Sequence, residues 1–144
     1  MKALTLWQPW ASYIAAGMKR YETRSWETRY RGPLAIHAAA RKPTAGEREL
    51  LEKYPLLGPL LPLPFGAIVA TCELVDCILM HDANIAAVNR REFDLGDWYP
   101  GRYAWSLVNV VPLKVPFPIK GGQGLWETGL PLPSDMPGME EVQR

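Results

Sequence analysis

Apolar and polar residues alternate along several stretches of the chain, with the period of two that is typical of β-strands with one buried face. Within residues 102–111, Tyr103, Trp105 and Leu107 occupy one set of alternate positions, and the positions between them are mostly small or polar. Residues 66–80 form a longer and more apolar stretch, with the composition of a buried strand. The pattern predicts five strands, at residues 2–6, 20–26, 34–39, 66–80 and 102–111.

Helical spacing is confined to short segments. Near the amino terminus, four apolar residues recur at intervals that predict one helix face: Trp7, Trp10, Ala11 and Ile14. Pro9 suits the first turn of this helix and Gly17 its end, because proline lacks an amide N–H and glycine tolerates a left-handed backbone. A second helix is predicted at residues 44–54, where Pro55 stops it, and a weak helical turn at residues 82–91.

Strands with a few short helices predict an α+β domain built on a small, curled mixed sheet or barrel. The length of 144 residues and the hydrophobic share of 48% suit one domain with a substantial core. We expect this domain at residues 1–130, followed by a loose tail at residues 131–144. No apolar run approaches the roughly 18 residues of a membrane span, and the first residues lack the apolar stretch of a signal peptide. A soluble, cytoplasmic protein without a membrane partner is therefore expected.

The charges are unevenly distributed. Residues 1–42 hold eight Lys and Arg residues but only two carboxylates, whereas residues 43–144 hold eight against thirteen. A basic segment on an otherwise acidic chain favours a local anionic ligand over the coating of long duplex DNA, which requires a strongly basic domain. The alternative is that these cations are ordinary solvated surface groups.

Several chemistries are not supported by the sequence. Cys72 and Cys77 lie five positions apart in a predicted strand, which places them on opposite faces, and neither a disulfide nor a zinc site follows. With only His37 and His81 besides, no metal-ligand cluster is predicted. The glycine-rich residues 121–124 lack the phosphate-binding P-loop pattern and are predicted as a turn. We expect neither a metal nor a cofactor.

The most informative residues lie where the first helix gives way to the second strand. Glu22 and Arg24 are two positions apart, so their side chains project from the same face of a strand and can address one ligand or each other. Lys19 has the opposite parity, but it lies in the turn after Gly17 and its ammonium can still reach the same site. The alternative is an ion pair that only links neighbouring side chains, worth about 0 to 1 kcal/mol if exposed.

These residues form the pattern Gly-x-Lys-x-x-Glu-x-Arg at residues 17–24, which resembles the motif of the ASCH domain, a family of the PUA-like superfamily. The segments at residues 4–11, 32–39, 66–70 and 103–105 are similar to other strands and turns of that family. The resemblance extends over roughly residues 1–130. It implies a PUA-like small mixed β-barrel of five to six strands with two to three short helices.

The resemblance also implies a function, namely binding of RNA or a modified nucleoside in a cationic cleft around the motif. The ligand-binding residues that we expect on this basis are Gly17, Lys19, Glu22, Arg24, Trp26 and Arg41. Aromatic rings can stack on RNA bases, and the candidates are Trp7, Trp26, Trp98, Trp105 and Trp126. Most of them must belong to the core of so small a domain, and Trp26 and Trp98 are predicted to be the exposed ones. The sequence leaves the oligomeric state open.

Some members of the family are hydrolases, which is the alternative function. A metal-independent ribonuclease branch uses a Tyr, the motif Lys and a Ser, for which Tyr13, Lys19 and Ser106 are the candidates here. The alternative for Tyr13 is that it packs on the surface of the helix, and the alternative for Ser106 is that it is a polar strand residue without a catalytic role. In this reading Glu22 holds a cation or accepts a proton.

An amidohydrolase branch, which removes acetyl from N4-acetylcytidine, uses a Lys, a Thr and a Glu. Lys19 matches the Lys, but Glu22 stands where that branch has the Thr, so the expected nucleophile is missing. Thr23 is adjacent and is expected to face away on a regular strand. Glu73, in the predicted strand at residues 66–80, is the candidate for the Glu that this branch uses.

Overall fold

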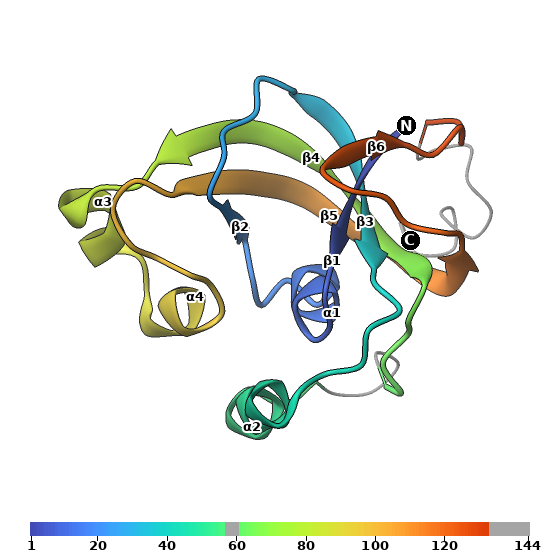
Figure 1. Cartoon of the computed structure of the whole chain (residues 1–144), viewed down its shortest axis with the longest axis horizontal. Helices are drawn as coiled ribbons and strands as arrows, with labels where there is room; N and C mark the ends of the chain where they lie inside the picture. The colour runs from blue at the N-terminus through green and yellow to red at the C-terminus, as the bar shows by residue number, and fades with distance from the viewer. Residues whose placement is uncertain (57–60, 133–144) are drawn as a thin grey trace.

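The fold is described from a computed structural model, which describes residues 1–56 and 61–132. Its six strands form one sheet in the order β2-β5-β4-β3-β1-β6 (Figure 1). The strands are β1 Lys2–Leu6, β2 Tyr21–Arg24, β3 Gly32–Ala38, β4 Ala67–Leu79, β5 Tyr103–Pro118 and β6 Leu125–Glu127. The helices are α1 Trp10–Ala15, α2 Ala45–Lys53, α3 Asp82–Ala87 and α4 Arg90–Asp94.

The sheet is mixed, because β1 pairs in parallel with β3 while every other pairing is antiparallel. The long strands β4 and β5 curve together across the molecule, and α1 lies against the sheet (Figure 1). This is the curled α+β architecture that the sequence predicted. The described part has four short helices rather than two or three, since the weak turn predicted at residues 82–91 forms both α3 and α4.

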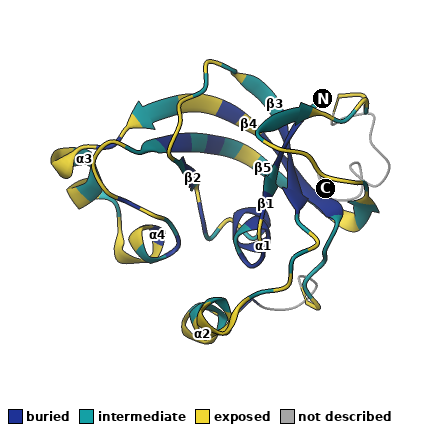
Figure 2. Cartoon of the chain, viewed as in Figure 1, coloured by how far each residue is buried: buried dark blue, intermediate teal, exposed yellow. Residues whose placement is uncertain are grey.

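The main core lies between α1 and the sheet. Ile14 of α1, Leu4 of β1, Ile36 of β3 and Trp105 of β5 are all fully buried in it. Burial is concentrated on α1, β1 and β3, whereas α2, α3 and α4 are largely exposed (Figure 2). The turn that begins the motif follows α1 directly, so it starts from a well-packed helix, whereas β2, which carries the rest of the motif, is an edge strand paired with β5.

Two expectations about core residues are wrong. Cys72 and Cys77 were expected on opposite faces of the strand, but both pack against the main core. The cause is a register shift between Leu74 and Asp76 in the pairing of β4 with β5, which changes the face to which the following side chains point. Trp7 precedes α1 instead of sharing its apolar face, and it is 56% exposed.

The last residues are described only in part. Of the tail predicted at residues 131–144, residues 133–144 lie outside the described residues. Strand β6, which the hydrophobic pattern did not predict, pairs with β1 and brings Glu127 to the amino-terminal ammonium of Met1, at 2.6 Å. No helix in the described ranges has the length and apolar character needed to cross a membrane.

Candidate functional site

A cavity of about 620 Å³ opens where the motif meets the connection between α4 and β5. We call it the Lys19 cavity. Its lining comes from the end of β1 and the start of α1, from the motif, and from the connection after α4: Thr5, Leu6, Trp7, Trp10, Lys19, Glu22, Thr23, Arg24, Asp94, Leu95, Gly96, Asp97 and Arg102. Three of the predicted ligand-binding residues, Lys19, Glu22 and Arg24, meet here.

The turn after α1 carries Lys19 into the cavity wall. Gly17 adopts a left-handed backbone with φ of 76°, which reverses the chain at the end of the helix. The carbonyl of Tyr13 then accepts hydrogen bonds from the N–H groups of Met18, at 3.0 Å, and Lys19, at 3.2 Å. Gly17 itself is exposed and does not line the cavity, so its contribution is to the turn.

Lys19 is unusual for a lysine because its side chain is buried. Its side chain is only 1% exposed, and among the described residues its Nζ has no hydrogen-bond partner. The nearest carboxylate oxygen, Glu22 Oε1, lies 3.8 Å away. Burial lowers the pKa of Lys19 below its ordinary value of 10.5, and the negative charges of Glu22 and Glu92 only partly oppose this effect.

Glu22 joins the two motif cations. Its Oε2 accepts a hydrogen bond from Arg24 Nε at 2.9 Å, while its Oε1 faces the ammonium of Lys19. Arg24 also donates from Nη2 to the carbonyl oxygen of Thr5 at 3.0 Å, which ties the motif strand to the end of β1. The carboxylate therefore orients Arg24 while leaving the Lys19 donors free for a ligand.

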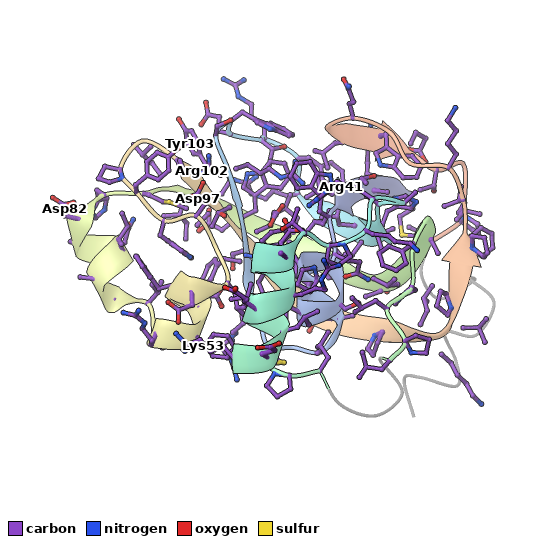
Figure 3. All side chains as sticks on the ribbon, turned by 60° about the horizontal axis from the view of Figure 1, so that its bottom comes forward. Arg41, Lys53, Asp82, Asp97, Arg102 and Tyr103 are labelled. Carbon is purple, nitrogen blue, oxygen red and sulfur yellow. The ribbon has the colours of Figure 1, made fainter. Side chains whose placement is uncertain are left out.

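The connection after α4 forms the opposite wall. Arg102 donates from Nε to the carbonyl of Asp97 at 2.9 Å and from Nη2 to the carbonyl of Thr23 at 3.2 Å. Figure 3 shows Asp97 and Arg102 close together beside Tyr103. Asp94 accepts hydrogen bonds from the Tyr54 hydroxyl and from Lys53, which lower its pKa to about 2 and keep it ionised.

The charged groups of the lining balance. Lys19, Arg24 and Arg102 face Glu22, Asp94 and Asp97, three cations against three carboxylates. The described lining therefore has no net formal charge, whereas the family resemblance implied a cationic cleft around the motif. A cavity of mixed donors and acceptors suits a ligand that carries both, rather than a cluster of phosphates.

The aromatic wall differs from the prediction. Trp7 and Trp10 line the cavity, and the Arg41 guanidinium lies 3.8 Å from the centre of the Trp7 ring. Arg41 lies just before the start of α2 (Figure 3). Its Nη2 forms an ion pair with Glu47 Oε2 at 2.9 Å, which holds the guanidinium over the ring. Trp7 is one of the candidate tryptophans for base stacking, but its apolar spacing assigned it to the buried face of the first helix, so it was not predicted to be exposed.

The two tryptophans expected to be exposed behave differently. Trp26 is 38% exposed but packs edge-to-face on Trp105 and does not line the cavity. Trp98 is only 9% exposed, and its indole N–H donates to the carbonyl of Glu92 at 3.0 Å. The prediction for Trp98 is wrong because the turn that carries it folds back onto α4.

Two candidate catalytic residues lie away from the Lys19 cavity. Tyr13 is fully buried, its hydroxyl donates to the carbonyls of Tyr54 and Leu50, and burial raises its pKa to about 12. Ser106 pairs with Tyr21 in the sheet and is not among the lining residues. Neither position supports a direct role beside Lys19.

Of the two further candidates for amidohydrolase chemistry, Thr23 lines the cavity and Glu73 does not. Glu73 is exposed on β4 and does not line the cavity. Thr23 does line it, contrary to the expectation that it faces away, but its hydroxyl accepts a hydrogen bond from the N–H of Asp97 at 3.0 Å. Within residues 1–56 and 61–132, no group of three or more His, Cys, Asp or Glu side chains is arranged to hold a metal ion.

Known proteins resemble this chain in sequence and in fold. Activating signal cointegrator 1 of Homo sapiens is 34% identical over 131 residues, which cover 86% of this chain and 22% of that protein. The Mus musculus protein of the same name is 32% identical, with the same coverage. The chain thus spans about a fifth of the length of these curated relatives.

The solved structures show the shared fold. ASCH from Zymomonas mobilis aligns with a TM-score of 0.57 at 15% identity, covering 87% of this chain and 85% of that one. A mutant form of the same protein aligns with a TM-score of 0.54 at 14% identity, covering 87% of each chain. The family model of the ASCH domain matches residues 4–117, and the chain therefore belongs to the ASCH domain family, as the motif at residues 17–24 predicted.

Proposed function

We propose that this protein binds single-stranded RNA or a modified nucleoside and takes one nucleoside into the Lys19 cavity. The observation that carries the proposal is the ammonium of Lys19, which is buried in the cavity wall without a hydrogen-bond partner among the described residues. An unpartnered buried donor is costly, and a ligand acceptor such as a base carbonyl or a ribose oxygen would satisfy it.

The rest of the lining is consistent with a nucleoside. A base edge carries both donors and acceptors, and the cavity offers three cationic donors opposite three carboxylates. Trp7 and Trp10 supply aromatic faces on which a base can stack. The association of the ASCH family with RNA binding supports the same class of ligand.

Replacement of Lys19 by methionine tests this proposal. Methionine keeps the length and the apolar stem but removes the charge, and we expect binding of a short single-stranded RNA or of the preferred nucleoside to weaken about 10- to 100-fold. A panel of the four nucleosides, N4-acetylcytidine and a labelled RNA would be titrated by calorimetry in EDTA. Arg29→Ala is the matched control, because Arg29 is exposed and does not line the cavity. Equal affinity of wild type and Lys19→Met would reject the proposal.

A metal-independent hydrolase is the second candidate, and the lowered pKa of Lys19 favours it, because a neutral amine can accept a proton. The same EDTA incubations would be analysed for cleaved RNA and for cytidine released from N4-acetylcytidine. A rate that rises with pH through the lowered pKa of Lys19 would indicate a base. Binding that weakens over the same pH range, without product, would indicate a cationic clamp.

A further inference from the structure

A second cavity, of about 630 Å³, lies beside the Lys19 cavity, under the connection between β5 and β6. We call it the His37 cavity. It is lined by Thr5 and His37 from the sheet, by Ala39 and Ala40 after β3, by Gly66 before β4, and by residues 119–123. Gly121, Gly122 and Gln123, from the glycine-rich segment that the sequence predicted to be a turn, form one of its walls.

The chemistry of this cavity differs from that of its neighbour. No carboxylate is among its described lining residues, and Lys120 contributes a positive charge. The loop is also rich in free donors, since among the described residues no backbone carbonyl accepts a hydrogen bond from the amide N–H of Gly121, Gly122 or Gln123. These residues are exposed, and a turn whose successive amide N–H groups have no partner within the described protein can bind an anion beside the positive charge of Lys120.

The glycines let this loop lie close to the sheet. A Cβ at Gly121 would come within 2.7 Å of the His37 ring, and a Cβ at Gly122 within 3.0 Å of the Trp126 ring. The loop is held in place at its start, where the carbonyl of Ile119 accepts from His37 Nε2 at 2.7 Å. The wall of the cavity is therefore a fixed backbone surface rather than a set of long side chains.

The two cavities adjoin. Thr5 lines both of them, and its carbonyl binds Arg24 while its hydroxyl binds His37 at 3.1 Å. On the flank, Arg41 follows Ala40 directly in the chain and stacks on Trp7 of the Lys19 cavity. The shared residue makes the two cavities direct neighbours, as a ligand longer than one nucleoside requires.

We propose that the His37 cavity binds the phosphate of the nucleotide adjoining the one held in the Lys19 cavity, through Lys120 and the backbone amides of residues 121–123. The inference rests on the proposed function, since it assumes a nucleoside in the Lys19 cavity. The balanced charges of that cavity leave little attraction for a phosphate, whereas the positive, carboxylate-free lining of the His37 cavity attracts one. The preferred ligand is therefore an RNA strand of at least two nucleotides.

The test compares a nucleoside with dinucleoside monophosphates that contain it on either side of the phosphate. In the wild-type protein we expect the better dinucleotide to bind about tenfold more tightly than the nucleoside. In Lys120→Glu this ratio should fall to about 2 or less, because the variant places a repelling charge beside the phosphate. Arg29→Glu makes the same charge change at an exposed residue outside both cavities and should retain the wild-type ratio.

Salt dependence supplies an independent readout. One phosphate contact to a single strand contributes about 0.7 to the slope of log affinity against log salt concentration, so Lys120→Ala should reduce the slope for a short RNA by about that amount. An unchanged ratio in Lys120→Glu, or a wild-type ratio near 1, would overturn the phosphate site. Failure of the nucleoside to bind the wild-type protein at all would instead contradict the proposed function.

Discussion

At the scale of single residues, Lys19 shows a conflict between stability and function. A buried ammonium without hydrogen bonds is destabilising, and Glu22 retains Arg24 as a partner when Lys19 is replaced. We therefore expect Lys19→Met to unfold at a higher temperature than the wild type and to gain about 1 to 3 kcal/mol in free energy of unfolding at neutral pH. Denaturant titration measures this gain, and a variant less stable than the wild type would show that the ammonium supports the fold.

The gain should depend on pH in a defined direction. Because the folded-state pKa of Lys19 lies below its ordinary value of 10.5, the unfolded chain binds more protons between these two values. The stability of the wild type therefore rises with pH across this window, and the advantage of Lys19→Met shrinks. Titrations from pH 7 to pH 10.5 on both proteins check the trend, and a constant difference would contradict it.

The sequence predicted the central residues of the site better than its outer ones. Lys19, Glu22 and Arg24 are neighbours in the chain, so strand parity and one turn were enough to bring them together. The environments of Tyr13 and Trp98 depend instead on carbonyl oxygens of α2 and α4, contacts that no local pattern encodes. The same is true of Trp7, whose partner Arg41 lies beyond β3.

At the scale of elements, the first turn of α2 fixes one edge of the Lys19 cavity. Thr44 and Glu47 form a capping box, and the Glu47 carboxylate also holds the guanidinium of Arg41 over Trp7. We expect Glu47→Gln to release Arg41 and to shift the indole N–H signal of Trp7 in a nitrogen-15 spectrum. Trp7→Phe identifies that signal.

Thr44→Ala is the control for this prediction. It removes only the side-chain cap, which typically costs about 1 kcal/mol in free energy of unfolding, and it leaves the pair of Arg41 and Glu47 intact. The indole signal of Trp7 should therefore stay in place in this variant. If both variants shift the signal equally, the helix cap and not the ion pair positions Arg41.

The elements themselves were largely predictable, and the exceptions have local causes. Strand β1 coincides with its prediction at residues 2–6. Strand β5 continues seven residues beyond the predicted end at Val111, as far as Pro118. This extension contains three prolines, and the alternation of apolar and polar residues did not predict it. The bulge that places Cys77 on the main core is a property of strand pairing, so spacing along one strand could not reveal it.

At the scale of the whole molecule, His37 connects segments that are distant in the chain. Its Nε2 must donate to the carbonyl of Ile119, because a carbonyl only accepts, so in a neutral ring Nδ1 accepts from the Thr5 hydroxyl. That hydroxyl in turn accepts from the indole N–H of Trp126 at 3.0 Å. One neutral imidazole thus joins β1, β3 and the connection between β5 and β6.

Acid should therefore loosen this connection. Burial lowers the pKa of His37 below its ordinary value of 6.5, so the unfolded chain binds the proton more readily, and stability falls as the pH drops below 6.5 toward the lowered pKa. One proton contributes a slope of at most about 1.4 kcal/mol per pH unit. Protonation of Nδ1 would also remove the bond from Thr5, at the residue that both cavities share. Unfolding titrations of wild type and His37→Gln from pH 7.5 to pH 5 measure the effect, since the variant should lose this part of the slope. Equal slopes for the two proteins would assign the acid sensitivity to other groups.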